Sequence, residues 1–230
     1  MRLLTLLLMI VCLAACSGKR GSGDIVSETR NTGTFNSLKV SGDFLVEVVK
    51  GPTAVKIDAD DNLIRSITTE VDNGLLTIRS KDQSIRNANF KVFITTPEMQ
   101  DIQVSASATV NVNDNFINTG EIELESSSAG KITAPVDCPN IKAEASSGSN
   151  INISGRTRDL KVSASSGSSI NARNLMAEDT KVNVSSGADA DVHASVHLNA
   201  SASSGGSIHY TGNAKVQKSV SSGGSVSQDQ

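Results

Sequence analysis

The sequence predicts an all-β protein, a right-handed parallel β-solenoid (β-helix) preceded by a partly antiparallel N-terminal β cap. Seven segments of similar sequence follow one another from residue 102, and their starts lie 18 to 20 residues apart. Each segment alternates apolar and polar residues on both sides of a small polar corner, which is the period of a β-strand. All five phenylalanines precede residue 120, so the two halves of the chain are expected to bury cores of different composition.

The repeated segments are too short to fold alone. Each holds two short strands joined by a corner, and such units become stable only by stacking on one another. In a parallel solenoid each coil lies one strand spacing, ~4.8 Å, above the last, so that seven coils rise about 34 Å. Parallel crossovers are right-handed. The segments are IQVSASATVNV from 102, IELESSSAGKIT from 122, IKAEASSGSNINI from 141, LKVSASSGSSINA from 160, TKVNVSSGADADV from 180, LNASASSGGSIHY from 198 and VQKSVSSGGSVSQ from 216.

A Ser-Ser-Gly corner recurs in these segments. Because equivalent residues stack in register, every coil needs a corner residue that tolerates a tight turn and lets neighbouring backbones approach, and glycine does both. The corner serines can bond to backbone groups that the bend leaves unpaired. The predicted corner glycines are Gly148, Gly167, Gly187, Gly205 and Gly223.

The alternation also assigns the two sides of each strand. Aliphatic residues take the core-facing positions, which include Ile141, Ala143, Ala145, Leu160, Val162, Ala164, Val182 and Val184. Polar residues take the outward positions of the second strand, namely Asn150, Asn152, Asn171, Asp189, Asp191 and His209. Such a hydrated face can bind a flat ligand such as a glycan, and it can equally bind nothing.

The half between Phe35 and Pro97 is also β in pattern. Strands are predicted within residues 35–51, 54–59, 70–80 and 89–97. Asn73-Gly74, between alternating apolar residues, is the signal of a two-residue antiparallel hairpin. The apolar residues Leu63, Ile64 and Ile67 fit either one helical turn or a bent connection. We expect an N-terminal β region over 34–101 that caps the solenoid of 102–230, the two forming one continuous domain.

The start of the chain predicts export and lipid attachment. Residues 1–15 have an early arginine and a short apolar run, as a secretory signal does, and the run is too short to span a membrane. The following LAAC resembles the lipobox of bacterial lipoproteins, so Cys16 is the predicted lipid attachment site. Residues 16–33 are rich in glycine, serine and charge, which predicts a flexible tether. The resemblance to bacterial lipoproteins also implies the outer membrane, because Ser17 follows the cysteine, and it leaves the leaflet open.

Cysteine count and charge exclude several classes of protein. Removal of residues 1–15 deletes Cys12 and acylation occupies Cys16, so Cys138 is the remaining cysteine and we expect it to be a small buried hydrophobe. The mature chain keeps 20 basic residues (21 less Arg2) against 24 acidic ones, a net charge of −4. With no tryptophan and one tyrosine, the sequence lacks the stacking platform and basic groove of a nucleic-acid-binding protein.

Two patterns in the sequence contain the residue types that bind metal ions. Asp58, Asp60 and Asn62 stand at the first, third and fifth positions of a calcium-binding loop, but Leu63 and Thr69 replace the required glycine and glutamate, so a solvated turn is predicted. The second pattern is the alternating set Asp189, Asp191 and His193, with His197 beyond it, which we interpret as a solvated ladder because no second shell is evident. No cofactor or metal is predicted.

Catalysis is not predicted either. Glu121, Glu123 and Glu125 alternate around buried positions, yet glycoside hydrolysis needs two carboxylates in unequal environments, and these three look equally exposed. The serines would require a base, and none of the three histidines (His193, His197 and His209) lies in a nucleophile elbow. Phosphate-binding and dinucleotide-binding glycine motifs are absent from the sequence.

Residues 35–80 followed by NFKVFITTPEMQDIQVSASATVNV, together with the serine-glycine coils, resemble the family described as putative auto-transporter adhesin, head GIN domain. The resemblance covers about residues 35–225. It implies a β-helical lipoprotein of Bacteroidetes-like bacteria and carries over no catalytic residue. We expect a noncatalytic binding or adhesion module of the cell envelope, held at the membrane by its lipid, with a glycan or a protein as ligand. The alternatives are a passive envelope scaffold and a carbohydrate-active enzyme; the oligomeric state stays open.

Overall fold

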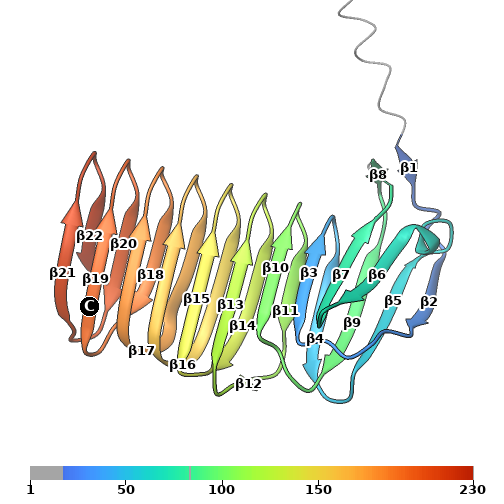
Figure 1. The fold of residues 1–230 in the computed structure, drawn as a ribbon. Coiled ribbons are helices and arrows are strands. Elements are labelled where there is room, and N and C mark those ends of the chain that lie inside the picture. The colour runs from blue at the N-terminus through green and yellow to red at the C-terminus, as the bar shows by residue number, and fades with distance from the viewer. Residues whose placement is uncertain (1–17, 83, 230) are drawn as a thin grey trace, which may run out of the picture.

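The computed structural model describes residues 18–82 and 84–229. The predicted signal segment, residues 1–15, and the predicted lipid attachment site Cys16 lie outside the described residues. The described chain is almost entirely β, and its strands stack into a long solenoid with two rows of strands, which we call the front sheet and the back sheet (Figure 1). The predicted parallel β-solenoid with a partly antiparallel N-terminal cap is confirmed. No helix in this part of the chain is long and apolar enough to cross a membrane.

The front sheet has one antiparallel pair, β6 with β7, and all its other neighbours pair in parallel. Starting at the cap, its strands are β6 (Ile67–Asp72), β7 (Leu75–Ser80), β3 (Ser37–Ser41), β10 (Asp101–Ser105), β13 (Glu121–Ser126), β15 (Asn140–Ala145), the second halves of β16 (Asn150–Ala164) and β17 (Ser169–Val184), β19 (His197–Ala202) and β21 (Lys215–Val220).

The back sheet begins with two antiparallel pairs, β2 with β5 and β5 with β9, and is parallel from there on. Its strands are β2 (Ile25–Arg30), β5 (Ala54–Asp60), β9 (Phe90–Thr96), β4 (Leu45–Lys50), β11 (Thr109–Val112), β14 (Lys131–Asp137), the first halves of β16 and β17, β18 (Asp189–His193), β20 (Ser207–Thr211) and β22 (Ser225–Gln228). The short elements are β1 (Lys19–Arg20), β8 (Ile85–Arg86), β12 (Phe116–Ile117) and the 3-10 turn η1 (Ile64–Ser66).

Equivalent residues of successive coils stack in register, as predicted. Ile141 pairs with Leu160, which pairs with Thr180. All the core-facing residues named from the sequence are buried, and so is Cys138. The register of the first coil is different from the prediction, because Ile102 pairs with Leu124 instead of Ile122. The additional short strand β12 lengthens the connection between the first two corners and shifts the alignment by two residues.

The corners are tight two-residue turns. In seven successive corners the two central residues both have positive φ, as in Ser147 (53°) and Gly148 (70°), which is the requirement of a type I′ turn. The N–H of the second central residue donates to a carbonyl of the next corner, for example from Gly148 to Ser166 O at 3.1 Å. Each corner that is followed by another coil therefore donates a main-chain hydrogen bond to the corner of that coil.

The role predicted for the corner glycines was partly wrong. A Cβ placed on any of the five predicted corner glycines would meet no atom within 4 Å, so these residues are needed for their positive φ and not for close approach of backbones. Close approach occurs at other glycines: a Cβ on Gly155 would collide with the carbonyl oxygen of Val136, and one on Gly206 would crowd the backbone of Val184.

Buried serines supply the predicted bonds to the backbone at two corners. The Ser149 hydroxyl donates to Ser126 O (2.7 Å) in the previous coil and accepts from the Ser146 N–H (3.1 Å). Ser168 makes the equivalent bonds with Ala145 O and the Ser165 N–H. A hydroxyl at this buried position links successive coils and also satisfies a donor within its own turn.

The N-terminal half contains the predicted hairpin and a coil of its own. Asn73 and Gly74, both with positive φ, join the antiparallel strands β6 and β7, and η1 shows that the undecided segment makes a short helical turn. The coil of β3 and β4 pairs in parallel with β10 and β11 on one side and with β7 and β9 on the other. It thus lies between segments that follow it in the sequence. Phe44 and Phe90 stack at this end, with ring centroids 5.0 Å apart.

Part of the predicted flexible tether is folded. Residues 25–30 form β2, which pairs with β5 over six residues, and residues 19–20 form β1, which pairs with β8. The composition of this segment was misleading because an edge strand needs backbone partners more than buried side chains, and β2 is mostly exposed. The segment is also held by Asp60, a fully buried carboxylate that accepts a hydrogen bond from the Gly23 N–H at 2.7 Å.

Candidate functional site

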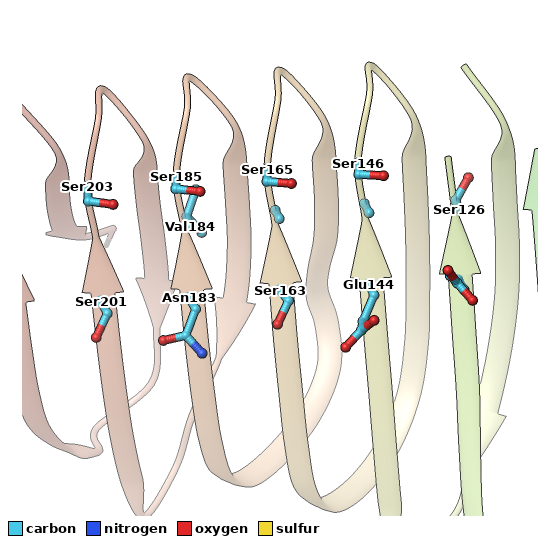
Figure 2. Close-up of a pocket in the computed structure, with 13 residues that line it drawn as sticks. Ser126, Glu144, Ser146, Ser163, Ser165, Asn183, Val184, Ser185, Ser201 and Ser203 are labelled. Atoms are coloured by element: carbon cyan, nitrogen blue, oxygen red, sulfur yellow. The ribbon is translucent and has the colours of Figure 1, made fainter. Parts of the chain in front are cut away.

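The main candidate site is a shallow groove of about 400 Å³ on the front sheet, near the corners. Because the coils stack in register, each outward position repeats along the solenoid as a row with one strand spacing between its members. The groove is built from two such rows, and Figure 2 shows their side chains standing next to one another on successive coils. The rows are Glu125, Glu144, Ser163, Asn183 and Ser201, and then Ser146, Ser165, Ser185 and Ser203. We call this surface the serine groove.

The second row consists of hydroxyl groups that the described chain leaves without a partner. The corner serines use their backbone groups to close the turns, as when Ser146 O accepts from the Ser149 N–H at 3.2 Å. The hydroxyls of Ser146, Ser165, Ser185 and Ser203 make no hydrogen bond within residues 18–82 and 84–229. A hydroxyl both donates and accepts, so the row can bond to a ligand that presents either kind of group.

At the charged end of the groove, Glu144 is paired within the protein, whereas Glu125 is in no ion pair among the described residues. Lys142 Nζ lies 2.6 Å from Glu123 Oε1 and 3.1 Å from Glu144 Oε1. The hydrogen bond that the Lys142 ammonium donates to Glu123, followed by the one it donates to Glu144, raises the pKa of this ammonium well above its usual range. Ser163, Asn183 and Ser201 continue the same row without charge. The groove therefore offers neutral hydrogen-bonding groups over three coils.

Sequence reasoning missed the open hydroxyls because it assigned all corner serines to backbone bonding. The structure divides them by position: the serine that follows the glycine is buried and bonds to the backbone, while the serine that begins the corner faces the groove. The signal was present in the repeat. Ser146, Ser165, Ser185 and Ser203 stand at one position of four successive segments, directly after a core-facing residue, where alternation predicts an outward side chain.

The residues weighed as a calcium loop have structural partners. Asp60 was predicted to lie in a solvated turn, but it is fully buried and accepts from the N–H groups of Gly23 and Asn89 at 2.7 and 2.8 Å. Asp58 accepts from the Ser27 hydroxyl at 2.6 Å, which together with Lys56 lowers the pKa of its carboxyl. Asn62 donates to Arg20 O at 2.8 Å. This loop fastens the N-terminal segment to the cap.

The other predicted metal-ligand candidates are not brought together. Asp191 accepts from Arg173 at 3.1 Å, and His193 Nδ1 lies 3.1 Å from the Thr211 hydroxyl. His197 Nδ1 lies 2.6 Å from Asp179 Oδ1, and Asp189 is exposed. Within the described residues, no group of three or more histidine, cysteine or acidic side chains is arranged to hold a metal ion.

The predicted polar outward face of the back sheet is present. Asn150, Asn171 and Asp189 are exposed, while Asn152, Asp191 and His209 are partly buried by their neighbours. Arg173 joins this face to the end of the chain by contacting both Asp191 and Asp229. His209 Nδ1 lies 3.0 Å from the Ser227 hydroxyl. These contacts follow the rows, so the face is a continuous polar surface.

One carboxyl that sequence reasoning did not single out has an unusual environment. Asp101 on β10 pairs in register with Glu123 on β13, and its Oδ1 atom is buried without a hydrogen bond. Burial raises the pKa of the Asp101 carboxyl, Gln103 opposes this by hydrogen bonding, and Glu123 and Glu125 add to the increase. Glu121, Glu123 and Glu125 lie on one face as predicted, with Glu123 bound to Lys142.

The comparisons with known proteins agree with the geometry. The family described as putative auto-transporter adhesin, head GIN domain, matches residues 34–214. The chain belongs to this family. The predicted membership is thereby confirmed, and it associates the chain with adhesin-like proteins of the cell surface or envelope. No curated protein matches the sequence.

Solved structures with the same fold come from species of Bacteroides and Parabacteroides. A putative adhesin from Bacteroides fragilis has 19% identity and a TM-score of 0.84, covering 92% of this chain and all of its own. A putative adhesin from Parabacteroides merdae has 17% identity and a TM-score of 0.73, with 92% and 98% covered. A putative lipid binding protein from Parabacteroides distasonis has 21% identity and a TM-score of 0.71, with 92% and 99% covered. At these identities the likeness establishes the fold alone.

Proposed function

We propose that this chain is a noncatalytic binding module of the cell envelope, and that its serine groove binds an extended, uncharged glycan. The observation that carries the proposal is the row of four unpartnered hydroxyls, one on each of four successive coils. A neutral glycan presents hydroxyls along its length, so it can donate to and accept from each member of the row. The adhesin names of the family and of the related structures also favour binding over catalysis.

The proposal includes a lipid anchor at Cys16, which places the solenoid at the outer membrane. The sequence LAAC after a short apolar run supports it. More than one acyl chain is needed for stable anchoring. Metabolic labelling with a palmitate analogue should mark the wild-type chain and should not mark Cys16→Ala. Labelling of the variant would contradict the anchor.

A groove-blocking substitution tests the proposed ligand. Ser163 is exposed in the middle of the groove, so Ser163→Arg should fill it while changing stability by less than about 0.5 kcal/mol. Ser169→Arg introduces the same side chain on the back sheet of the same coil, on the other side of the corner, and serves as the matched control. On an array of neutral glycans, the chain purified in mild detergent should bind a subset, Ser163→Arg should lose that binding, and Ser169→Arg should keep it.

Two results would contradict the proposed function. If the wild-type chain binds no neutral glycan, or if both variants bind as well as it does, the serine groove is not the binding site. Protease treatment of intact cells gives an independent test, because an adhesin must be reachable from outside. Protection of the chain there would favour the passive scaffold of the envelope.

A further inference from the structure

A second groove lies on the same front sheet, at the opposite ends of the strands. It has a volume of about 430 Å³ and crosses the strands β16, β17, β19 and β21 near their starts on this sheet. Its lining includes Lys161 and Lys181, and we call it the lysine groove. It shares no lining residue with the serine groove, so its chemistry can be tested independently.

The lysines of this groove belong to a row that the solenoid places in register. Lys142 pairs with Lys161, and Lys161 pairs with Lys181. Asn199 and Gln217 continue the row on the next two coils. Three ammonium groups therefore stand one strand spacing apart, ~4.8 Å at the backbone. Like charges directly opposite each other on neighbouring strands destabilise a sheet.

Only the first member of this row has a counter-charge in contact. Lys142 is held by Glu123 and Glu144. Lys161 and Lys181 are exposed and make no ion pair or hydrogen bond with any side chain of the described residues. Two positive charges are thus stacked without a partner, at the floor of a groove.

The carboxylates that flank these lysines are paired elsewhere. Asp159 accepts from Arg158 Nε at 2.7 Å, and Asp179 lies 2.6 Å from His197. Both carboxylates line the lysine groove, but their contacts are with Arg158 and His197. The acidic residues nearest to Lys161 and Lys181 do not reach them, and the lysines stay open to an anion from outside.

We propose that Lys161 and Lys181, with the amide of Asn199 on the next coil, bind the carboxylates of an acidic polysaccharide built from uronic acids. Such a polymer carries one carboxylate on every sugar ring, at a repeat on the order of the strand spacing. Each carboxylate can therefore meet one member of the row. The absence of tryptophan and the single tyrosine of the chain disfavour a nucleic acid as the anion, since single strands are bound by stacking on aromatic rings.

Polygalacturonate is the probe that tests this proposal, with dextran as its neutral counterpart. Binding to the chain in mild detergent is measured by titration calorimetry at low salt. Lys161→Gln/Lys181→Gln should bind polygalacturonate about tenfold more weakly, because two exposed charge pairs are lost. Lys161→Arg/Lys181→Arg keeps the charges and should retain the affinity within a few-fold. Dextran should not compete.

Lys39→Gln/Lys131→Gln is the matched control. It removes the same charge from exposed positions on β3 of the front sheet and β14 of the back sheet, neither of which lines the lysine groove. The control should bind polygalacturonate as the wild type does, and thermal unfolding should show all variants folded. The proposal is overturned if polygalacturonate does not bind to the wild type. It is also overturned if Lys161→Gln/Lys181→Gln and the control Lys39→Gln/Lys131→Gln lose affinity equally, or if neither of these two variants loses affinity. Tighter binding of an oligothymidylate of equal charge would also overturn it. Ser163→Arg changes the serine groove and not the lysine groove, so a loss of neutral-glycan binding in this variant concerns the serine groove alone.

Discussion

The two ends of the solenoid are finished in different ways. At the N-terminal end, antiparallel strands and stacked phenylalanines close the core, and Val92 and Ile94 beneath them are fully buried. At the C-terminal end no further strand lies beyond the last coil, β21 and β22, in the described chain (Figure 1). Val220 on this coil is 49% exposed. The same coil geometry thus ends once in a hydrophobic cap and once in an open edge.

The open end carries polar residues at positions that face the core elsewhere. Lys218 pairs in register with the buried Ala200, and Gln228 pairs with the buried Tyr210. An inward-pointing charge on an edge strand is one of the ways in which β proteins prevent edge-to-edge association. In this solenoid, an apolar cap covers the core at one end, and polar residues take core-facing positions at the other.

The largest expected difference between the ends concerns their aromatic and aliphatic side chains. Phe44→Ala removes a buried ring from the cap and should lower the free energy of unfolding by about 3–5 kcal/mol. Val226→Ala acts on a partly covered residue of the last coil and should cost less than about 1 kcal/mol. Urea unfolding followed by circular dichroism measures both. Equal losses would mean that the last coil is packed as tightly as the cap.

The second expected effect comes from the buried carboxylate of the cap. Asp60→Ala leaves the N–H groups of Gly23 and Asn89 without their acceptor, which should cost roughly 2–4 kcal/mol. Asp189→Ala, at an exposed position of the solenoid, should stay within about 0.5 kcal/mol of the wild type. Hydrogen exchange should also become faster in β2 of the first variant. Unchanged exchange in β2 would show that its backbone pairing with β5 holds this strand in place without Asp60.

The third prediction removes the charge that ends the solenoid. Lys218→Val makes the core-facing side of β21 apolar, so we expect two chains to associate through their last coils, with less than about 1 kcal/mol of change in the stability of the monomer. Lys215→Val changes the same residue type on the outward side of the same strand and should stay monomeric. Light scattering during gel filtration measures both masses. Association of the wild type, or of both variants alike, would refute the proposed role of Lys218.

The sequence predicts the repeated part of the fold because aligning the repeated segments shows which residues of successive coils are equivalent. The seven corners, the core-facing residues and the hairpin at Asn73-Gly74 all followed from period and turn chemistry. It was insufficient where a single local event interrupts the period. The strand β12 shifts the first coil by two residues, and nothing in the pattern of Ile102 and Ile122 distinguishes the two alignments.

Contacts between distant segments were also beyond the sequence. Composition assigned residues 16–33 to a tether, whereas β2 pairs with β5 through backbone groups that every residue carries. The burial of Asp60 depends on Gly23 and Asn89, which lie far from it in the sequence. For the candidate sites, the rows of serines and lysines could be inferred from the repeat, but the pairing that leaves Lys161 and Lys181 without a counter-charge required the side-chain contacts.

The smallest expected effects are electrostatic and have opposite signs in the two regions. Burial raises the pKa of Asp101, beside the coil of β3, so its ionised form is disfavoured in the folded state. The resulting destabilisation is absent below the ordinary value of 3.8 and grows as pH rises through the folded pKa. Asp101→Asn should therefore stabilise the protein by less than about 1 kcal/mol near neutral pH, and this gain should vanish in acid.

Asp229 at the C-terminal end should show the reverse. The hydrogen bond from Arg173 lowers the pKa of its carboxyl, so its contribution to stability is present above 3.8 and is lost as pH falls through the folded pKa. Asp229→Asn should lower the melting temperature slightly near neutral pH, with no difference from the wild type in strong acid. Thermal unfolding of both variants across this pH range measures the two signs. If both melting temperatures shift in the same direction, burial does not distinguish Asp101 from the exposed carboxyl at the open end.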